Sequence, residues 1–371
     1  MKFPLSKIVS STAQALLVGG ALCGLAGCGS MSSSSSTTTT PVTTTPPDVY
    51  AAGIETIGTQ TKAAVWKNGT ETVLDSGSYS AQAASVAVAN GHVYVVGMEG
   101  SASGNNVAVI WDNGTATPLP MMGTYSAADG VMVLGTDVYV VGNDQVSIAD
   151  PASAKAVFWK NGVESVLPDS GYGASAYAIT NDGTNVFIGG TSSLVLSSSS
   201  TATTIGPQAA YWKNGTLTSI NNSPTATNVT SMTVSNGHVY LAGYLCSLTA
   251  PDCDSAAYWQ DATIYPQSPA VFSSATGIAV SGTNIYASEN IFPTSATATT
   301  AAALMTNGSL TTLSSTAGSA ANCVVVYGSD VYVGGALNSS PTYWKNGQSV
   351  TLTTAAKTAS LMAMAVVPAG T

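Results

Sequence analysis

The chain has 371 residues, of which only 7% are charged, and its formal net charge is −9. It has no arginine, so it lacks the basic patch that neutralises phosphates, and we expect no nucleic-acid partner. The apolar residues come in short runs broken by turn-forming residues, which favours many short strands over membrane-spanning helices.

The first 28 residues have the features of an export signal. Lys2 and Lys7 precede the apolar run AQALLVGGALCGLAGC, which is too short and too rich in glycine for a comfortable membrane-spanning helix. The run ends in Leu25-Ala26-Gly27-Cys28, which resembles the lipobox of bacterial lipoproteins. The resemblance implies cleavage before Cys28, acylation of its thiol and new amine, and firm anchoring, because each buried CH₂ contributes about 0.8 kcal/mol. The alternative is an ordinary secretory signal that is cut elsewhere.

Residues 1–27 are therefore predicted to be a signal peptide and residues 28–48 a tether. The segment 29–48 consists mainly of Ser, Thr and Pro and has almost nothing to bury, which predicts disorder. Gly29 rather than Asp follows Cys28, and in proteobacterial sorting this favours the outer membrane. We expect an exported protein that its lipid holds on a membrane of the bacterial cell envelope.

The rest of the chain, 49–371, repeats one unit seven times. The units begin at Val49, Val93, Val138, Val186, Val239, Ile285 and Val331, which lie 44 to 53 residues apart. Self-similarity at this period is typical of a propeller or a solenoid.

Each full unit has four strand-like runs, here called A to D. In the second unit they are ASVAVAN, HVYVVG, VAVIW and TATPL. Asn113-Gly114 joins C to D, and Asn-Gly is the strongest short hairpin signal because both central residues of a type I′ turn need positive φ. The same turn recurs in every unit except the fifth, which has Asp261-Ala262.

Four antiparallel strands in each of seven units predict an all-β fold, a seven-bladed β-propeller. The first unit begins at its B run, with no A run before it, and a lone A-like run at 360–367 follows the last unit. This run is predicted to complete the first blade and close the ring, since an open solenoid has no reason to divide a unit in this way.

The B run resembles the second strand of kelch-type propellers, which ends in a glycine pair. The pair is seen here in VFIGG at 186–190 and VYVGG at 331–335. The aromatic-acidic pair of the third kelch strand appears as Trp111-Asp112, but elsewhere as Trp-Lys, and the later kelch Trp is missing. The resemblance covers roughly 49–367 and implies the fold alone, because kelch repeats serve enzymes, adaptors and adhesion proteins alike.

The most conspicuous side chains are predicted to be structural. All six Trp residues end a C run, and Met305 takes that place in the sixth unit. A residue that recurs in every blade is expected to pack between blades, where its large apolar area is buried. His92 and His238 each follow an Asn-Gly turn in different units, which indicates turn-end residues and not a metal pair.

Function is expected at one end of the blades. The A–B and C–D turns share one end and are tight, whereas the B–C and D–A connections at the other end vary in length, as on the binding faces of repeat proteins. The candidate binding residues there are Tyr79, Tyr125, Tyr172, Glu99, Asp144, Asp252 and Asp254. The alternatives are that the tyrosines pack beneath the loops and that the carboxylates form a solvated acidic rim.

The cysteines are not predicted to be catalytic. Cys246 and Cys253 lie in the fifth B–C connection, and a disulfide between them, favoured in an oxidising compartment, would stabilise the fold by roughly 2–3 kcal/mol. Cys323 lies in an A run and is expected to be a buried thiol, and no His is near it in the repeat.

These observations predict a lipid-anchored, non-enzymatic binding or scaffold module that takes a glycan, a peptide or an envelope protein on its variable face. We find no catalytic constellation, cofactor motif or metal-ligand spacing in the sequence. The alternative is a propeller enzyme that acts on polysaccharide, a lyase or a glycoside hydrolase, with its two carboxylates supplied by the variable face.

Overall fold

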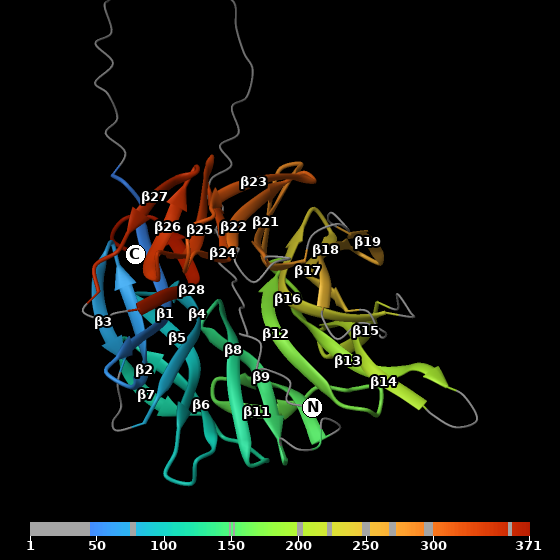
Figure 1. Ribbon diagram of the computed structural model, residues 1–371. Helices are drawn as coiled ribbons and strands as arrows, with labels where there is room; N and C mark the ends of the chain where they lie inside the picture. The colour runs from blue at the N-terminus through green and yellow to red at the C-terminus, as the bar shows by residue number, and fades with distance from the viewer. Residues whose placement is uncertain are drawn as a thin grey trace, which may run out of the picture.

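The computed structural model describes residues 45–74, 79–147, 150, 153–198, 203–220, 225–246, 253–266, 272–292, 300–354 and 358–371. The predicted signal peptide, Cys28 and nearly all of the predicted tether lie outside these ranges. Within them the regular elements are β-strands, which form seven four-stranded antiparallel sheets arranged in a ring (Figure 1). The predicted seven-bladed β-propeller is confirmed.

The blades follow one another along the chain. Blade 1 consists of β28 (Thr358–Val367), β1 (Asp48–Ile57), β2 (Gln60–Lys67) and β3 (Thr70–Leu74). Blade 2 consists of β4 (Ala81–Ala89), β5 (His92–Gly100), β6 (Asn106–Asp112) and β7 (Thr115–Pro118). Blade 3 consists of β8 (Tyr125–Leu134), β9 (Asp137–Gln145), β10 (Ala154–Lys160) and β11 (Val163–Val166). Blade 4 consists of β12 (Ala174–Asn181), β13 (Val186–Ser198), β14 (Thr203–Lys213) and β15 (Thr216–Ser219).

The remaining three blades have the same order. Blade 5 consists of β16 (Ala226–Ser235), β17 (His238–Cys246), β18 (Cys253–Gln260) and β19 (Thr263–Pro266). Blade 6 consists of β20 (Ser273–Ser281), β21 (Asn284–Ile291), β22 (Ala301–Thr306) and β23 (Ser309–Ser314). Blade 7 consists of β24 (Ala320–Tyr327), β25 (Asp330–Leu337), β26 (Ser340–Lys345) and β27 (Gln348–Thr351).

The ring is closed by the C-terminal strand. β28 pairs antiparallel with β1, with Met364 opposite Ala51, so the last strand of the chain completes the first blade as predicted. Gly370 N–H donates to Asp48 Oδ2 at 3.1 Å, which ties the end of β28 to the start of β1. Residues 45–47 therefore lead into β1 at the end of the blades that carries the A–B and C–D turns.

The repeated Asn-Gly turns do more than reverse the chain. Asn113 and Gly114 have φ values of 47° and 85°, as a type I′ turn requires. Asn113 Oδ1 also accepts the N–H of Val93, the second residue of β5, at 2.9 Å. The equivalent bond, 2.8–3.0 Å long, is present in all seven blades, and Asp261 makes it in blade 5.

A β-bulge interrupts the pairing of the first and second strands at the same place in every blade. Beside it the first strand crosses closely over the second, and a glycine stands there in six blades: Gly53, Gly97, Gly142, Gly190, Gly243 and Gly335. A Cβ at any of these positions would collide with a backbone carbonyl oxygen of the first strand. The last glycine of each V-Y-V-V-G-like run is therefore required by close backbone approach.

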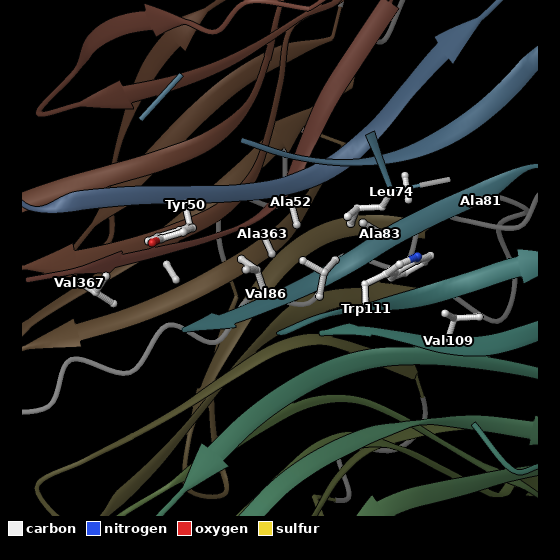
Figure 2. Close-up of a cluster of buried hydrophobic side chains, with 13 residues drawn as sticks. Tyr50, Ala52, Leu74, Ala81, Ala83, Val86, Val109, Trp111, Ala363 and Val367 are labelled. Carbon is white, nitrogen blue, oxygen red and sulfur yellow. The ribbon is translucent and has the colours of Figure 1, made fainter. Parts of the chain in front are cut away.

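The core lies between blades, where the tryptophans pack as predicted. Each of the six Trp side chains is at most 1% exposed. Trp111 of blade 2 packs against Leu74 at the end of blade 1, in a cluster with Val86 and Val109 (Figure 2). Met305, which replaces Trp in blade 6, is equally buried.

The B–C connection of blade 4 differs from the expectation. The sequence predicts a long loop over 191–208, but β13 and β14 continue through most of it and form a hairpin that projects from the ring (Figure 1). Its register runs on from the blade, with Leu194 opposite Gly206. The Ser- and Thr-rich composition concealed this extension, because neither residue type alternates with apolar residues in the way that a half-buried strand does.

Candidate binding face

The two ends of the propeller differ in chemistry. We call the end with the A–B and C–D turns the turn face, and the end with the B–C and D–A connections the loop face. The turn face has ion pairs at repeated positions, such as Lys160 Nζ to Asp137 Oδ2 at 2.7 Å in blade 3. Blade 2 reverses the order of acid and base at the same place, with His92 Nδ1 2.7 Å from Asp112 Oδ1. His92 is thus a turn-end residue bonded within its own blade.

The loop face instead presents apolar side chains to solvent. Sixteen large hydrophobic residues of the described ranges are more than a third exposed, and none of them lies in a turn of the turn face. Six lie on the outermost strands of the blades. The other ten, here called the loop-face apolar set, are Ile57, Tyr79, Met121, Met122, Val146, Tyr172, Val195, Ile205, Phe272 and Phe292. They come from blades 1, 3, 4 and 6 and from the connections between blades, so they encircle much of this end.

The three predicted tyrosines lie in successive D–A connections. Tyr79 is 48% exposed and Tyr172 39% exposed, so both present their rings on the loop face. Tyr125 is the first residue of β8 and is partly buried opposite Gln145. Tyr79 and Tyr172 therefore remain available to a ligand, whereas Tyr125 is held in the ladder.

Several acids on the strands that run toward the loop face are inside the protein. Glu55, Asp129, Asp144 and Glu289 are each at most 4% exposed. Asp144, a predicted binding residue, accepts the N–H of Met122 at 2.6 Å and that of Gly123 at 2.8 Å. The Asp144 oxygens therefore hold the D–A connection in place, and the predicted binding role of Asp144 stays a prediction.

The other acidic candidates are less fully described. Glu99 is partly buried in β5. Asp252 and the side chain of Asp254 lie outside the described residues. Their predicted binding role stays a prediction.

Two blades contain carboxyl pairs beneath their D–A connections. In blade 1 burial raises the pKa of Glu55, and the neighbouring Glu71 carboxyl raises it further, although Thr354 Oγ1 donates to Glu55 Oε2 at 3.0 Å. In blade 3 burial and then the nearby Asp144 carboxyl raise the pKa of Glu164 to about 7. The pairs occupy equivalent positions, since Glu71 is opposite Trp66 and Glu164 is opposite Trp159.

Two further buried acids line the inner strands. Burial raises the pKa of Asp129, the bulged residue of β8, well above its usual range, even though Asn143 Nδ2 donates to its Oδ2 at 2.7 Å. Burial also raises the pKa of Glu289 to about 7, and its Oε1 has no hydrogen-bond partner within the described ranges. Glu289 is opposite Ala275, at the place where the other six blades have glycine. In the sequence, IYASE in place of V-Y-V-V-G marks this exception.

The cysteines lie where the repeat predicts. Cys246 and Cys253 are Cα partners of β17 and β18, but the side chain of Cys253 is outside the description, and the disulfide stays a prediction. Cys323 is a fully buried free thiol, and burial raises its pKa to about 12. A thiol of this kind is inert, as expected.

The described residues do not gather into a metal centre. No group of three or more His, Cys, Asp and Glu side chains among them could hold a metal ion. His92 and His238 lie on the turn face of blades 2 and 5, each bonded to an aspartate. In the part of the chain that the structure covers, no helix has the length and apolarity needed to cross a membrane.

Comparison with known proteins found solved structures with a similar fold, two of which are described here. No family model matches the chain, and no curated protein sequence matches it. The β-propeller domain of the Trilobed protease from Pyrococcus furiosus is 10% identical, with a TM-score of 0.48 over 84% of this chain and 97% of that one. The acylaminoacyl peptidase of Pyrococcus horikoshii has the same identity and TM-score, and the match spans 84% of this chain but only 51% of the peptidase.

These findings correct one prediction. The sequence predicts a non-enzymatic binding or scaffold module, whereas the solved propellers that this chain resembles are parts of proteolytic enzymes. At 10% identity the likeness concerns the fold alone.

Proposed function

We propose that this propeller binds peptide segments on its loop face and serves a peptidase. The observation that carries peptide binding is the loop-face apolar set, which contrasts with the ion-paired turn face. The link to a peptidase is taken over from the names of the solved structures, so it is tested separately below.

The arrangement of the exposed side chains suits an extended peptide. Val195 and Ile205 are Cα partners on the projecting hairpin. Their side chains are 37% and 46% exposed and form one small apolar surface. Phe272 and Phe292 form another, joined by a backbone hydrogen bond of 2.7 Å from Phe292 N–H to the carbonyl oxygen of Phe272. Separate apolar surfaces of this size can contact alternate side chains of an extended peptide. Aromatic rings supply contact area at a low cost in conformational entropy.

Peptide binding can be measured with the mature protein. A fluorescein-labelled, uncharged peptide with alternating Leu residues is expected to bind, and its Leu→Ser counterpart is not. Phe272→Ser and Phe292→Ser together should weaken binding at least tenfold. The matched control is Leu310→Ser, since Leu310 is 45% exposed but lies on the outer strand β23. Equal affinity of the double variant and the wild type in fluorescence anisotropy would refute the proposal.

The peptidase link needs a second experiment. Cells that produce the wild-type protein are expected to cleave the same peptide faster than cells without it, and cells with the Phe272→Ser, Phe292→Ser variant should resemble the latter. If cleavage is independent of the protein while the purified protein still binds the peptide, the peptidase link is wrong and peptide binding stands.

We further propose that the chain is a lipoprotein of the bacterial envelope, with kelch-like repeats and a disulfide between Cys246 and Cys253. The lipobox-like Leu25-Ala26-Gly27-Cys28 supports lipidation. Since β1 begins at the turn face, the anchor would leave the loop face directed away from the membrane. Incorporation of labelled palmitate that is lost in Cys28→Ser tests the anchor.

A further inference from the structure

The bulged residue of the first strand links neighbouring blades in part of the ring. In blades 5, 6 and 7 its side chain donates a hydrogen bond to the next blade, to the carbonyl oxygen of the residue just before the bulge there. The three bonds are 2.7 or 2.8 Å long and run from Thr230 to Ala275, from Thr276 to Ala321 and from Asn322 to Leu361. Each bond joins one first strand to the next, so this position suits a hydrogen-bond donor.

Blade 3 has Asp129 as its bulged residue, and the residue just before the bulge of blade 4 is Ala176. These two blades are joined in the same way as blades 6 and 7. Asn143 Oδ1 accepts the N–H of Ala176 at 3.2 Å. Asn290 Oδ1 accepts the N–H of Ala321 at 2.9 Å in the equivalent place. The carbonyl oxygen of Ala176 is therefore the counterpart of the Ala321 oxygen.

The first strands of the two junctions also approach each other at matching points. Gly130 and Gly277 directly follow the bulged residues of blades 3 and 6. A Cβ added to Gly130 would lie 3.4 Å from the backbone nitrogen of Ile179, and one added to Gly277 would lie 2.9 Å from that of the equivalent Val324. The match places Asp129 beside the first strand of blade 4, since β8 and β12 are neighbours (Figure 1).

The hydrogen bonds of Asp129 leave one of its oxygens for the donor role. In blade 6 Asn290 Nδ2 also donates to the carbonyl oxygen of Ala321, at 3.1 Å. In blade 3 Asn143 Nδ2 donates instead to Asp129 Oδ2, at 2.7 Å. The atom of Asp129 that can supply the carbonyl oxygen of Ala176 is thus Oδ1. A carboxylate only accepts hydrogen bonds, whereas a protonated carboxyl group has one O–H to donate.

The surroundings of Asp129 favour the protonated carboxyl group. Asp129 is 2% exposed, and burial raises its pKa well above the usual range, although the hydrogen bond from Asn143 lowers it. The titratable neighbour on β12 is Tyr177. Burial, and to a lesser extent Asp129 and Tyr244 of β17, raise the pKa of the Tyr177 phenol to about 12, so it is neutral. Among the described residues no cation lowers the pKa of Asp129.

We propose that Asp129 is protonated in the folded protein and that its Oδ1–H donates to the carbonyl oxygen of Ala176, which joins blade 3 to blade 4. The proton makes this junction sensitive to pH. As the pH rises through the pKa of the buried carboxyl group, the donor is lost and a negative charge comes to face a carbonyl oxygen. The junction is therefore intact below this pKa and weakens above it, whereas the Thr and Asn bonds of blades 5, 6 and 7 do not titrate.

Threonine and valine at position 129 test the donor, because the two side chains have the same shape and only threonine has a hydroxyl group. Asp129→Thr copies blade 6, and we expect its equilibrium constant of unfolding to be at least about fivefold smaller than that of Asp129→Val. Thr276→Val removes the donor of blade 6 and is the matched control, with a similar increase expected over the wild type. Urea unfolding at pH 5, followed by Trp fluorescence, gives these constants. Equal stability of the two variants at 129, with a loss in Thr276→Val, would overturn the proposal.

Infrared spectroscopy tests the proton itself and does not depend on stability. Asp129→Asn is expected to fold, because Asn322 is the donor at the equivalent place in blade 7. At pH 5 an ordinary aspartate is ionised. The difference spectrum between wild type and Asp129→Asn at this pH should contain the C=O stretching band of a protonated carboxyl group, which gives way to carboxylate bands as the pH is raised. Carboxylate bands alone at pH 5 would show that Asp129 is ionised and would overturn the proposal.

Discussion

The turn face and the loop face of this propeller are built from the same strands but follow different rules. At the turn face all seven blades make the same hydrogen bond. The N–H of Val93, or of its equivalent in another blade, donates to the side-chain oxygen of the Asn or Asp in the C–D turn. Toward the loop face, just beyond the glycine of the second strand or Glu289 in its place, the equivalent residues are Ile54, Met98, Asn143, Thr191, Tyr244, Asn290 and Ala336. The sequence repeat thus ends at this glycine. The residues on the turn-face side of it stabilise the fold, whereas those on the loop-face side differ from blade to blade.

The largest effect is expected at that boundary. Gly97→Ala places a Cβ against the carbonyl oxygen of Gln82, and because the atoms that it meets are backbone of Gln82 and Ala83, no side chain can move aside to relieve the collision. We expect a loss of roughly 4 kcal/mol or more in the free energy of unfolding, enough to prevent folding of a marginal domain. Urea unfolding followed by Trp fluorescence measures it. A stable Gly97→Ala protein would mean that the close approach does not enforce the glycine.

Blade 6 is the exception to this pattern, because Glu289 occupies the position that is glycine in the other six blades. The folded-state pKa of Glu289 is about 7 against an ordinary value of 4.5. Between these values the folded state keeps a proton that the unfolded state has lost, so stability should fall as the pH rises through this window and level off above it. The full effect is about 3 kcal/mol.

The matched variant for this prediction is Glu289→Gln, because a Gln side chain resembles the protonated, neutral Glu side chain and does not ionise. It should remove this part of the pH dependence and be more stable than the wild type at pH 8 but not at pH 4. The measurement is urea unfolding of both proteins across that range. Identical pH profiles would show that Glu289 is ionised in the folded protein.

At the turn face itself the effect should be smaller. Asn113→Ala removes the hydrogen bond from Val93 N–H and forces alanine to a φ of 47°. The two losses together are expected to cost about 2 kcal/mol. Asn113→Asp is the control, because Asp261 makes the same bond at a φ of 53° in blade 5. If Asp at 113 destabilises as much as Ala, the seven turns are not equivalent.

The sequence predicts the turn face better than the loop face for a physical reason. Asn113-Gly114 encodes its hairpin locally, and the lone run at 360–367 reveals the ring closure because a repeat must be completed. The role of Asp144 depends on where the connection at Met122 and Gly123 folds, which no local pattern contains. Charge alone suggested an exposed rim, whereas burial of acids beneath connections is a tertiary property.

The smallest effect on the free energy of unfolding is expected for a substitution of Tyr172. This residue is compared with Tyr94, a tyrosine at the turn face. Tyr172 is 39% exposed on the loop face, and Tyr172→Ser should change the free energy of unfolding by less than about 0.5 kcal/mol. Tyr94 is its counterpart at the turn face, where its ring stacks on His92 with centroids 5.4 Å apart and an interplanar angle of 7°. Tyr94→Ser should therefore destabilise by about 1–2 kcal/mol while leaving peptide binding unchanged.

Measured together, the two tyrosine variants separate the roles of the two faces. Tyr172→Ser should weaken peptide binding in fluorescence anisotropy and leave the unfolding curve in place, and Tyr94→Ser should do the reverse. If both variants shift the unfolding curve equally, the loop-face rings contribute to packing as the turn-face rings do. Binding that depends on Tyr172 but not on Tyr94 would identify the exposed apolar side chains of the loop face as the interaction surface.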